Sequence, residues 1–164
     1  MTSKEKPGLG ELLRYVGELV EQGAEEQYRT MKLAYRARYT PVLRALSAGA
    51  ETVTDITQRS NLTQGAISQT VGLMENDGLI ARHTLADGRK TGLRLTKKGC
   101  DLLKCLEPHW EVTFAVIRKL EREVGHPLLQ ALDDTARALE RQGFADRLRA
   151  AATESKNGKR KRGQ

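Results

Sequence analysis

The sequence has few of the residues that indicate a secreted, membrane-bound or metal-binding protein. Two cysteines and three histidines occur in 164 residues, which is too few for a disulfide framework, and they lack the spacing of a zinc site. No run of about 18 apolar residues exists, which excludes a transmembrane helix. The charged N-terminal segment has no apolar stretch behind it, so we see no secretory signal. We therefore expect a cytoplasmic protein without a metal, a cofactor or a membrane partner.

Aromatic residues make up only 4% of the chain, so a large aromatic ligand cage is not expected either. Basic residues, in contrast, outnumber acidic ones by 28 to 21, which gives a net charge of +7. Residues 82–98 contain six basic residues and one acidic residue, and residues 156–164 contain five basic residues and no acidic one. A basic excess indicates nucleic acid as the first candidate partner, and an acidic membrane or protein surface as the second.

The middle of the chain predicts two short helices followed by a hairpin. We expect helices over residues 52–60 and 64–77 and strands over residues 81–85 and 91–95. Thr52 and Asp55 resemble a capping box, Thr63 is placed to cap the second helix, and Gly78 is placed to end it. The segment between the strands contains Asp-Gly, which is typical of a hairpin turn. This order predicts a winged helix-turn-helix domain in a mainly α fold with a small β-hairpin wing.

The second short helix predicts a DNA-reading face. Four residues near its N-terminus lie away from the apolar positions, namely Gln64, Gly65, Ser68 and Gln69. In a helix-turn-helix this end of the second helix enters the major groove, where Gln can bind adenine and Ser can donate or accept. The alternative is an ordinary polar helix surface.

Helical segments flank this domain. Apolar residues recur at helical spacing over 9–27, 103–124 and 128–150. Pro108 predicts a kink or a break within the second of these segments. Cys100, Cys105 and His109 are too few for a zinc site, so we expect the two thiols to be buried beside the helix seam.

Residues 40–99 resemble the MarR family of transcriptional regulators. Residues 87–99 read Asp-x-Arg-x-x-x-Leu-x-Leu-Thr-x-x-Gly, which is the wing signature of that family. Residues 73–82 are similar to the exit of the family's recognition helix. The resemblance implies that Arg89 enters the minor groove and that Asp87 holds its guanidinium group. It also places three basic residues along the phosphates, namely Arg82, Lys90 and Arg94. The alternative is a solvated turn with a surface ion pair.

The resemblance further implies a homodimer, because both chain ends build the dimer interface in this family. It implies binding to a pseudo-palindromic operator, and repression is the commoner outcome in the family. A small-molecule effector would be held in a pocket lined by Tyr35, Tyr39, Trp110 and Phe114. Plain core packing is the alternative for these four residues.

The expected divisions of the chain are residues 1–39 (N-terminal dimerisation helix and linker), 40–99 (winged helix-turn-helix), 100–152 (C-terminal dimerisation helices) and 153–164 (disordered basic tail). Residues 100–150 are similar to the MarR half of proteins that fuse this module to an acetyltransferase. This likeness leaves open an accessory or protein-interaction module. The sequence contains no phosphate-binding glycine loop and no nucleophile–base pair, so we do not expect an enzyme.

Overall fold

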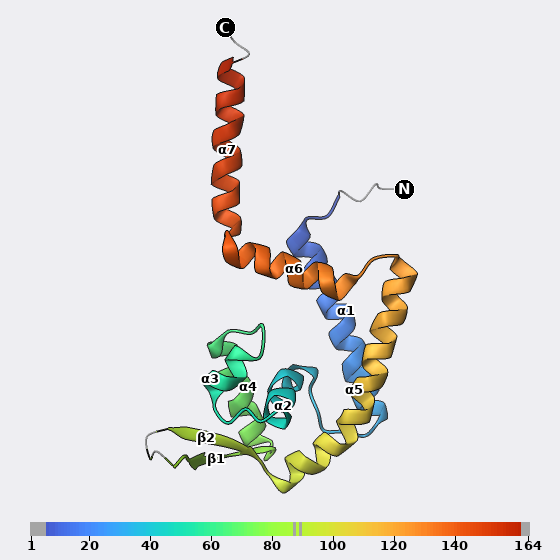
Figure 1. Ribbon diagram of the computed structural model, residues 1–164. Helices are drawn as coiled ribbons and strands as arrows, with labels where there is room; N and C mark the ends of the chain where they lie inside the picture. The colour runs from blue at the N-terminus through green and yellow to red at the C-terminus, as the bar shows by residue number, and fades with distance from the viewer. Residues whose placement is uncertain (1–5, 87, 89, 162–164) are drawn as a thin grey trace. The chain divides into compact units, whose positions relative to one another are not determined.

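A computed structural model describes the protein over residues 6–86, 88 and 90–161, and over residues 154–161 it describes the backbone alone. Its elements are α1 (Leu9–Thr30), the 3-10 helix η1 (Ala37–Tyr39), α2 (Thr40–Ser47), α3 (Val53–Gln58), α4 (Gln64–Asn76), β1 (Ile80–Thr84), β2 (Thr91–Leu95), α5 (Lys97–Val124), α6 (Leu128–Arg141) and α7 (Phe144–Lys161) (Figure 1). They form two compact units, residues 1–109 and residues 110–164. The predicted fold class, mainly α with a small hairpin, is confirmed.

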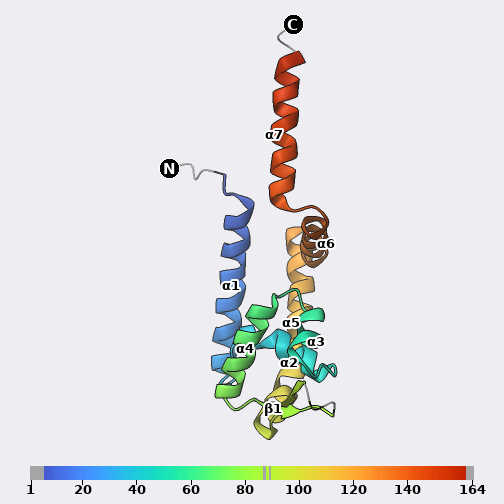
Figure 2. The same ribbon diagram turned by 90° about the vertical axis from the view of Figure 1, so that its left-hand side faces the viewer.

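The first unit is built around the helices predicted for the helix-turn-helix. α4 packs against α2 and α3, and the hairpin of β1 and β2 follows it directly (Figure 1, Figure 2). The side chains without exposed surface in this core are Tyr39, Val42, Leu43, Ile56, Ile67, Val71, Met74 and Leu106. Burying an aliphatic side chain of this size contributes about 1.5–3 kcal/mol. The core therefore fixes how α4 is held against α2 and α3.

Local sequence signals set the ends of the short helices. The Asp55 carboxylate accepts from the Thr52 backbone N–H at 3.0 Å, and the Thr52 hydroxyl accepts from the Asp55 N–H at 3.1 Å. Thr63 caps α4 by accepting from the backbone N–H of Ala66 at 3.2 Å. Gly78 follows α4 with φ of 71°, the left-handed conformation that glycine adopts without a Cβ clash. These signals were predicted and are confirmed.

The hairpin is antiparallel, with Ile80 opposite Leu95. β1 begins one residue earlier than predicted, because Ile80 already pairs in the ladder. β2 is also bound on its other side, where the Leu93 N–H donates to the Glu51 carbonyl at 2.8 Å. A two-stranded hairpin alone is marginally stable in water, so this bond and the burial of Leu93 help to hold the hairpin on the helices.

The later helices differ from the expected ones in where they divide and end. The break that was one alternative at Pro108 does not occur, because α5 continues through it and a helix of this length tolerates the loss of one backbone N–H donor. The final helix is divided into α6 and α7, and Gln142 between them has extended φ and ψ of −144° and 108°. α7 continues to Lys161, beyond the start of the expected disordered tail at residue 153. Its three consecutive alanines, residues 150–152, strongly favour the helix.

Both units expose apolar side chains along their helices. On α1 these residues are 44–63% exposed, and they are Leu9, Leu12, Leu13, Val16, Leu19 and Val20. In the second unit they are Val112, Val116, Leu120, Val124, Leu129, Leu132, Phe144 and Leu148. Rows of exposed apolar side chains mark interaction surfaces in soluble proteins. None of the described helices is long and apolar enough to cross a lipid bilayer.

Candidate nucleic-acid interface

The N-terminal half of α4 presents the polar residues that the sequence singled out. Gln64, Gly65, Ser68 and Gln69 are all exposed, whereas Ile67 and Val71 on the opposite side are fully buried. The helical period separates the two groups, because positions i, i+1, i+4 and i+5 share one face. Free backbone N–H groups at this helix end attract anions. This face can therefore approach a phosphate backbone and present amide and hydroxyl groups to base edges.

The hairpin supplies exposed positive charge beside α4. Arg94 points outward from β2, between the buried Leu93 and the half-buried Leu95, and Lys90 is exposed just before the strand. The predicted wing-tip pair, Asp87 and Arg89, lies outside the described residues. Its placement in a minor groove therefore stays a prediction.

Arg82 differs from the other basic residues of the hairpin. Its Nε and Nη2 atoms donate to the two carboxylate oxygens of Glu75 on α4, each at 2.8 Å. The hydrogen bond that Arg82 donates to Glu75 raises the pKa of Arg82 above its ordinary value. Glu75 therefore balances the charge of Arg82, and the paired side chains brace β1 against α4. Glu75 was not predicted, because its partner lies seven residues away across the helix end.

The exit of α4 is tied to the start of α5. The Thr96 hydroxyl donates to the Gly78 carbonyl at 2.6 Å, and its N–H donates to the Leu79 carbonyl at 3.0 Å. Lys98 Nζ donates to the Asp77 carbonyl at 2.6 Å. Gly99 packs so closely that an added Cβ would lie 2.2 Å from the Leu79 carbonyl oxygen. These contacts give a physical reason for the Leu-Thr-x-x-Gly end of the wing signature.

Three tyrosines form a buried cluster between α1 and α4. The ring of Tyr35 meets the rings of Tyr28 and Tyr39 edge-on, with centroid distances of 4.7 Å and 6.0 Å. The hydroxyls of Tyr35 and Thr40, the first residue of α2, are hydrogen-bonded at 2.8 Å. The Tyr39 hydroxyl donates to the Asp77 carboxylate at 2.7 Å. Burial raises the pKa of both Tyr35 and Tyr39, which keeps their hydroxyls protonated.

The residues predicted to line an effector pocket are not brought into one unit. Tyr35 and Tyr39 belong to the core of the first unit, with 4% and 0% of their surface exposed. Trp110 and Phe114 belong to the second unit. The predicted pocket therefore remains untested, and for the two tyrosines core packing accounts for their environment.

A hollow of about 490 Å³ adjoins the turn between α3 and α4. Arg44 from α2 and Arg59 and Asn61 from the turn line it. One guanidinium nitrogen of Arg59 donates to the Ala48 carbonyl, which holds the side chain over the turn. The sequence carries no signal for these two arginines, because α2 and the turn are brought together only by the fold.

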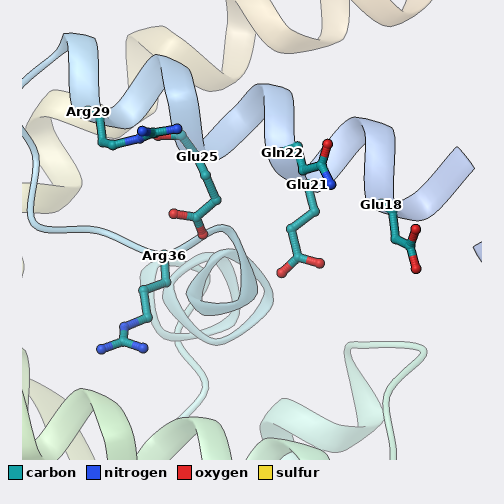
Figure 3. A pocket seen from close by; sticks show the side chains of 6 residues that line it. All are labelled: Glu18, Glu21, Gln22, Glu25, Arg29 and Arg36. Atoms are coloured by element: carbon teal, nitrogen blue, oxygen red, sulfur yellow. The ribbon is translucent and has the colours of Figure 1, made fainter. Parts of the chain in front are cut away.

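A second hollow, of about 530 Å³, lies along α1 and is acidic. Figure 3 shows the carboxylates of Glu21 and Glu25 on the side that faces the Arg36 guanidinium. Glu25 also accepts from the Ala37 backbone N–H at 2.9 Å. Among the described residues no group of three or more His, Cys, Asp or Glu side chains could hold a metal ion. Because three glutamates and two arginines line this hollow, it is less suited to nucleic acid than the uncharged polar face of α4.

The prediction that Cys100 and Cys105 are buried is wrong, because both thiols are exposed. The buried side of this part of α5 carries Gly99 and Leu106. Each cysteine is one residue away from one of these positions, which is enough to turn it toward solvent on a helix.

Comparisons with known proteins agree with this geometry. The sequence model of the MarR family matches residues 36–90, which include α2, α3, α4 and β1. No curated protein sequence matches the chain. The likeness of residues 100–150 to acetyltransferase fusions is not confirmed and stays a prediction.

Several solved structures share the fold. A MarR family transcriptional regulator from Silicibacter pomeroyi is 25% identical, covers 87% of this chain and 98% of its own, and has a TM-score of 0.56. The M. tuberculosis transcriptional regulator MOSR, solved in complex with DNA, is 18% identical over 84% of this chain and 100% of its own, with a TM-score of 0.66. MepR from S. aureus, also solved with DNA, is 19% identical over 82% and 99%, with a TM-score of 0.62. The chain therefore has the winged-helix fold of MarR-type transcriptional regulators.

Proposed function

We propose that the protein is a sequence-specific DNA-binding transcriptional regulator that acts as a homodimer on a pseudo-palindromic operator. The observation that carries this proposal is the exposed face of Gln64, Gly65, Ser68 and Gln69 on α4, in the unit that also carries the outward-pointing Arg94 of β2. Two proteins with the same fold were solved in complex with DNA, which supports DNA as the partner.

The proposed contacts divide into reading and anchoring. The α4 face reads base edges in the major groove, because Gln and Ser offer both donors and acceptors. Lys90 and Arg94 bind phosphates, and Arg89, held by Asp87, enters the minor groove. Arg82 contributes less to phosphate binding than the sequence suggests, since Glu75 pairs with it.

The exposed apolar residues support the homodimer. The apolar side chains along α1 are 44–63% exposed, and their contact with water is unfavourable. A second copy of the chain that covered them would remove this contact. A two-fold axis places two α4 helices on half-sites about one helical turn of DNA apart. The operator is therefore expected to be an inverted repeat.

We further propose repression as the outcome and a small molecule as the effector. Both rest on the family resemblance of residues 36–90. An effector acts only if it binds one arrangement of the protein more tightly than the other, and the difference sets how far operator occupancy shifts. A compound that raises the melting temperature of the protein and releases the operator would identify it.

The test is selection of bound sequences from randomised duplex DNA, followed by titration of the enriched sequence at several salt concentrations. We expect saturable binding to an inverted repeat. Arg89→Ala should weaken it and reduce the salt slope by about one charge per subunit, whereas the control Arg118→Ala, on α5 in the second unit, should change neither. No enrichment and no saturable binding at low salt would contradict the proposed function.

A further inference from the structure

We infer that Tyr39 is a positioning residue for α4: its hydrogen bond to Asp77 holds the helix in the orientation that distinguishes the operator from other DNA. This inference rests on the proposed function, because it assigns a second role to residues behind the same DNA-reading face. It concerns selectivity, since neither Tyr39 nor Asp77 belongs to the polar face that reads base edges.

The contact joins two parts of the chain that are 38 residues apart. Tyr39 ends η1, in the segment that leads from α1 to α2, and none of its surface is exposed. Asp77 is the C-cap residue of α4. The Tyr39 hydroxyl donates to the Asp77 Oδ2 atom at 2.7 Å, which is a short and well-formed bond. The far end of α4 is therefore fixed to the α1–α2 segment by a side-chain contact.

Neighbouring side chains fix the position of Tyr39. The Tyr39 ring packs edge-on against the Tyr35 ring, which packs edge-on against the ring of Tyr28 on α1. Glu25 of α1 accepts from the Ala37 N–H at 2.9 Å, which fixes the start of η1. The donor thus has a defined position, and the carboxylate of Asp77 must come to it.

The Tyr39–Asp77 hydrogen bond acts as an anchor for α4, and the reading of base edges depends on this anchor more than the binding of phosphates does. α4 is about 20 Å long at 1.5 Å per residue, so a tilt of about 3° at Asp77 moves the Gln64 end by roughly 1 Å. A hydrogen bond to a base edge is lost over such a distance. Long Lys and Arg side chains follow a phosphate over the same distance. Loosening the anchor should therefore lower operator affinity and leave non-specific affinity unchanged.

The test compares variants of the full-length protein on the enriched operator and on random duplex DNA of equal length. Tyr39→Phe removes only the hydroxyl, and Tyr35→Phe is the matched control, because it removes a buried hydroxyl that bonds to Thr40 and not to α4. We expect Tyr39→Phe to reduce the ratio of operator to random-DNA affinity about three- to tenfold, the effect of one hydrogen bond. Tyr35→Phe should leave this ratio within about twofold of the wild type.

Variants of the partly exposed Asp77 keep the inference testable if the buried tyrosine variant does not fold. Asp77→Asn retains an acceptor oxygen and should keep most of the ratio of operator to random-DNA affinity. Asp77→Ala should reduce this ratio as much as Tyr39→Phe does. The double variant Tyr39→Phe with Asp77→Ala should lose no more than either single one.

Each outcome has a separate meaning. A wild-type protein without operator preference contradicts the proposed function, and this inference with it. A wild-type preference that survives in Tyr39→Phe and Asp77→Ala overturns the positioning role alone. An equal loss in Tyr35→Phe also overturns it, because general loosening of the core would then be the cause.

Discussion

Gly99 is the position where the structure makes its sharpest stability prediction. Glycine inside a helix is normally a weakness, and replacement by alanine gains up to about 1 kcal/mol. At Gly99 the expected sign is reversed. The added Cβ would lie 2.2 Å from the carbonyl oxygen of Leu79 and 3.2 Å from its carbonyl carbon. That oxygen belongs to the backbone between α4 and β1, so no side-chain rotation can relieve the contact.

The magnitude follows from what must move. A relaxed contact needs the backbone of α5 or of Leu79 to shift by about 1 Å, and overpacking of this kind costs about 1–3 kcal/mol. The shift would also strain the 3.0 Å bond from the Thr96 N–H to the Leu79 carbonyl. A net hydrogen bond contributes about 1 kcal/mol. The gain in helix propensity of up to about 1 kcal/mol offsets part of these costs, so we expect Gly99→Ala to lower the free energy of unfolding by about 1–3 kcal/mol.

The assay is urea unfolding followed by circular dichroism, with Gly72→Ala as the matched control. Gly72 also lies inside a helix, α4, but an added Cβ there meets nothing within 4 Å. We expect this control to raise the free energy of unfolding by about 0.5–1 kcal/mol. If Gly99→Ala proves as stable as the wild type, the close approach of α5 to Leu79 is not a feature of the folded protein.

Three further predictions follow from the same structure. Arg94→Ala should reduce the salt slope of DNA binding by about one charge per subunit, and Arg82→Ala should reduce it by less, because Glu75 pairs with Arg82. If salt titrations of the two variants gave the same slope, the roles assigned to Arg82 and Arg94 would be contradicted. Val16→Glu should halve the mass measured by light scattering, because it places a charge in the exposed apolar row of α1; an unchanged mass would place the dimer interface elsewhere. The pKa of Asp55 lies below its ordinary value, mainly because its carboxylate accepts a hydrogen bond from the Glu51 backbone N–H. The ionised carboxylate therefore stabilises the fold at a pH above its unfolded pKa, and this stabilisation is lost as the pH falls through its folded pKa. Asp55→Asn should therefore flatten the loss of stability that acid causes in thermal melts, and an unaltered pH profile would show that the cap does not titrate in this way.

Features that depend on a few neighbouring residues could be predicted from the sequence. The Thr52–Asp55 capping box and the Thr63 cap are each complete within four residues. Gly78 belongs to the same group, since its left-handed conformation is a local requirement of the helix end. The exposed face of α4 could be predicted for a related reason, because the helical period alone separates it from the buried side.

Features that depend on how distant segments meet could not be predicted. The bond from Tyr39 to Asp77 spans 38 residues, and neither residue carries a signal that names the other. The exposure of Cys100 and Cys105 depends on which side of α5 is buried, a choice that a shift of one residue reverses. The division between α6 and α7 falls at Gln142 and Gly143, which are weaker helix breakers than the Gly-His-Pro sequence at residues 125–127.

The bond between Leu93 and Glu51 also bears on how the protein behaves at high concentration. Open strand edges recruit strands from other molecules, and this is a common route to aggregation. Glu51 occupies part of the outer edge of β2. Within the described part of the chain β1 pairs with β2 alone, but its outer edge carries Arg82 with a guanidinium fixed by Glu75. The fold thus keeps its small sheet from growing by two different means, occupation of one edge and a charge held in place at the other.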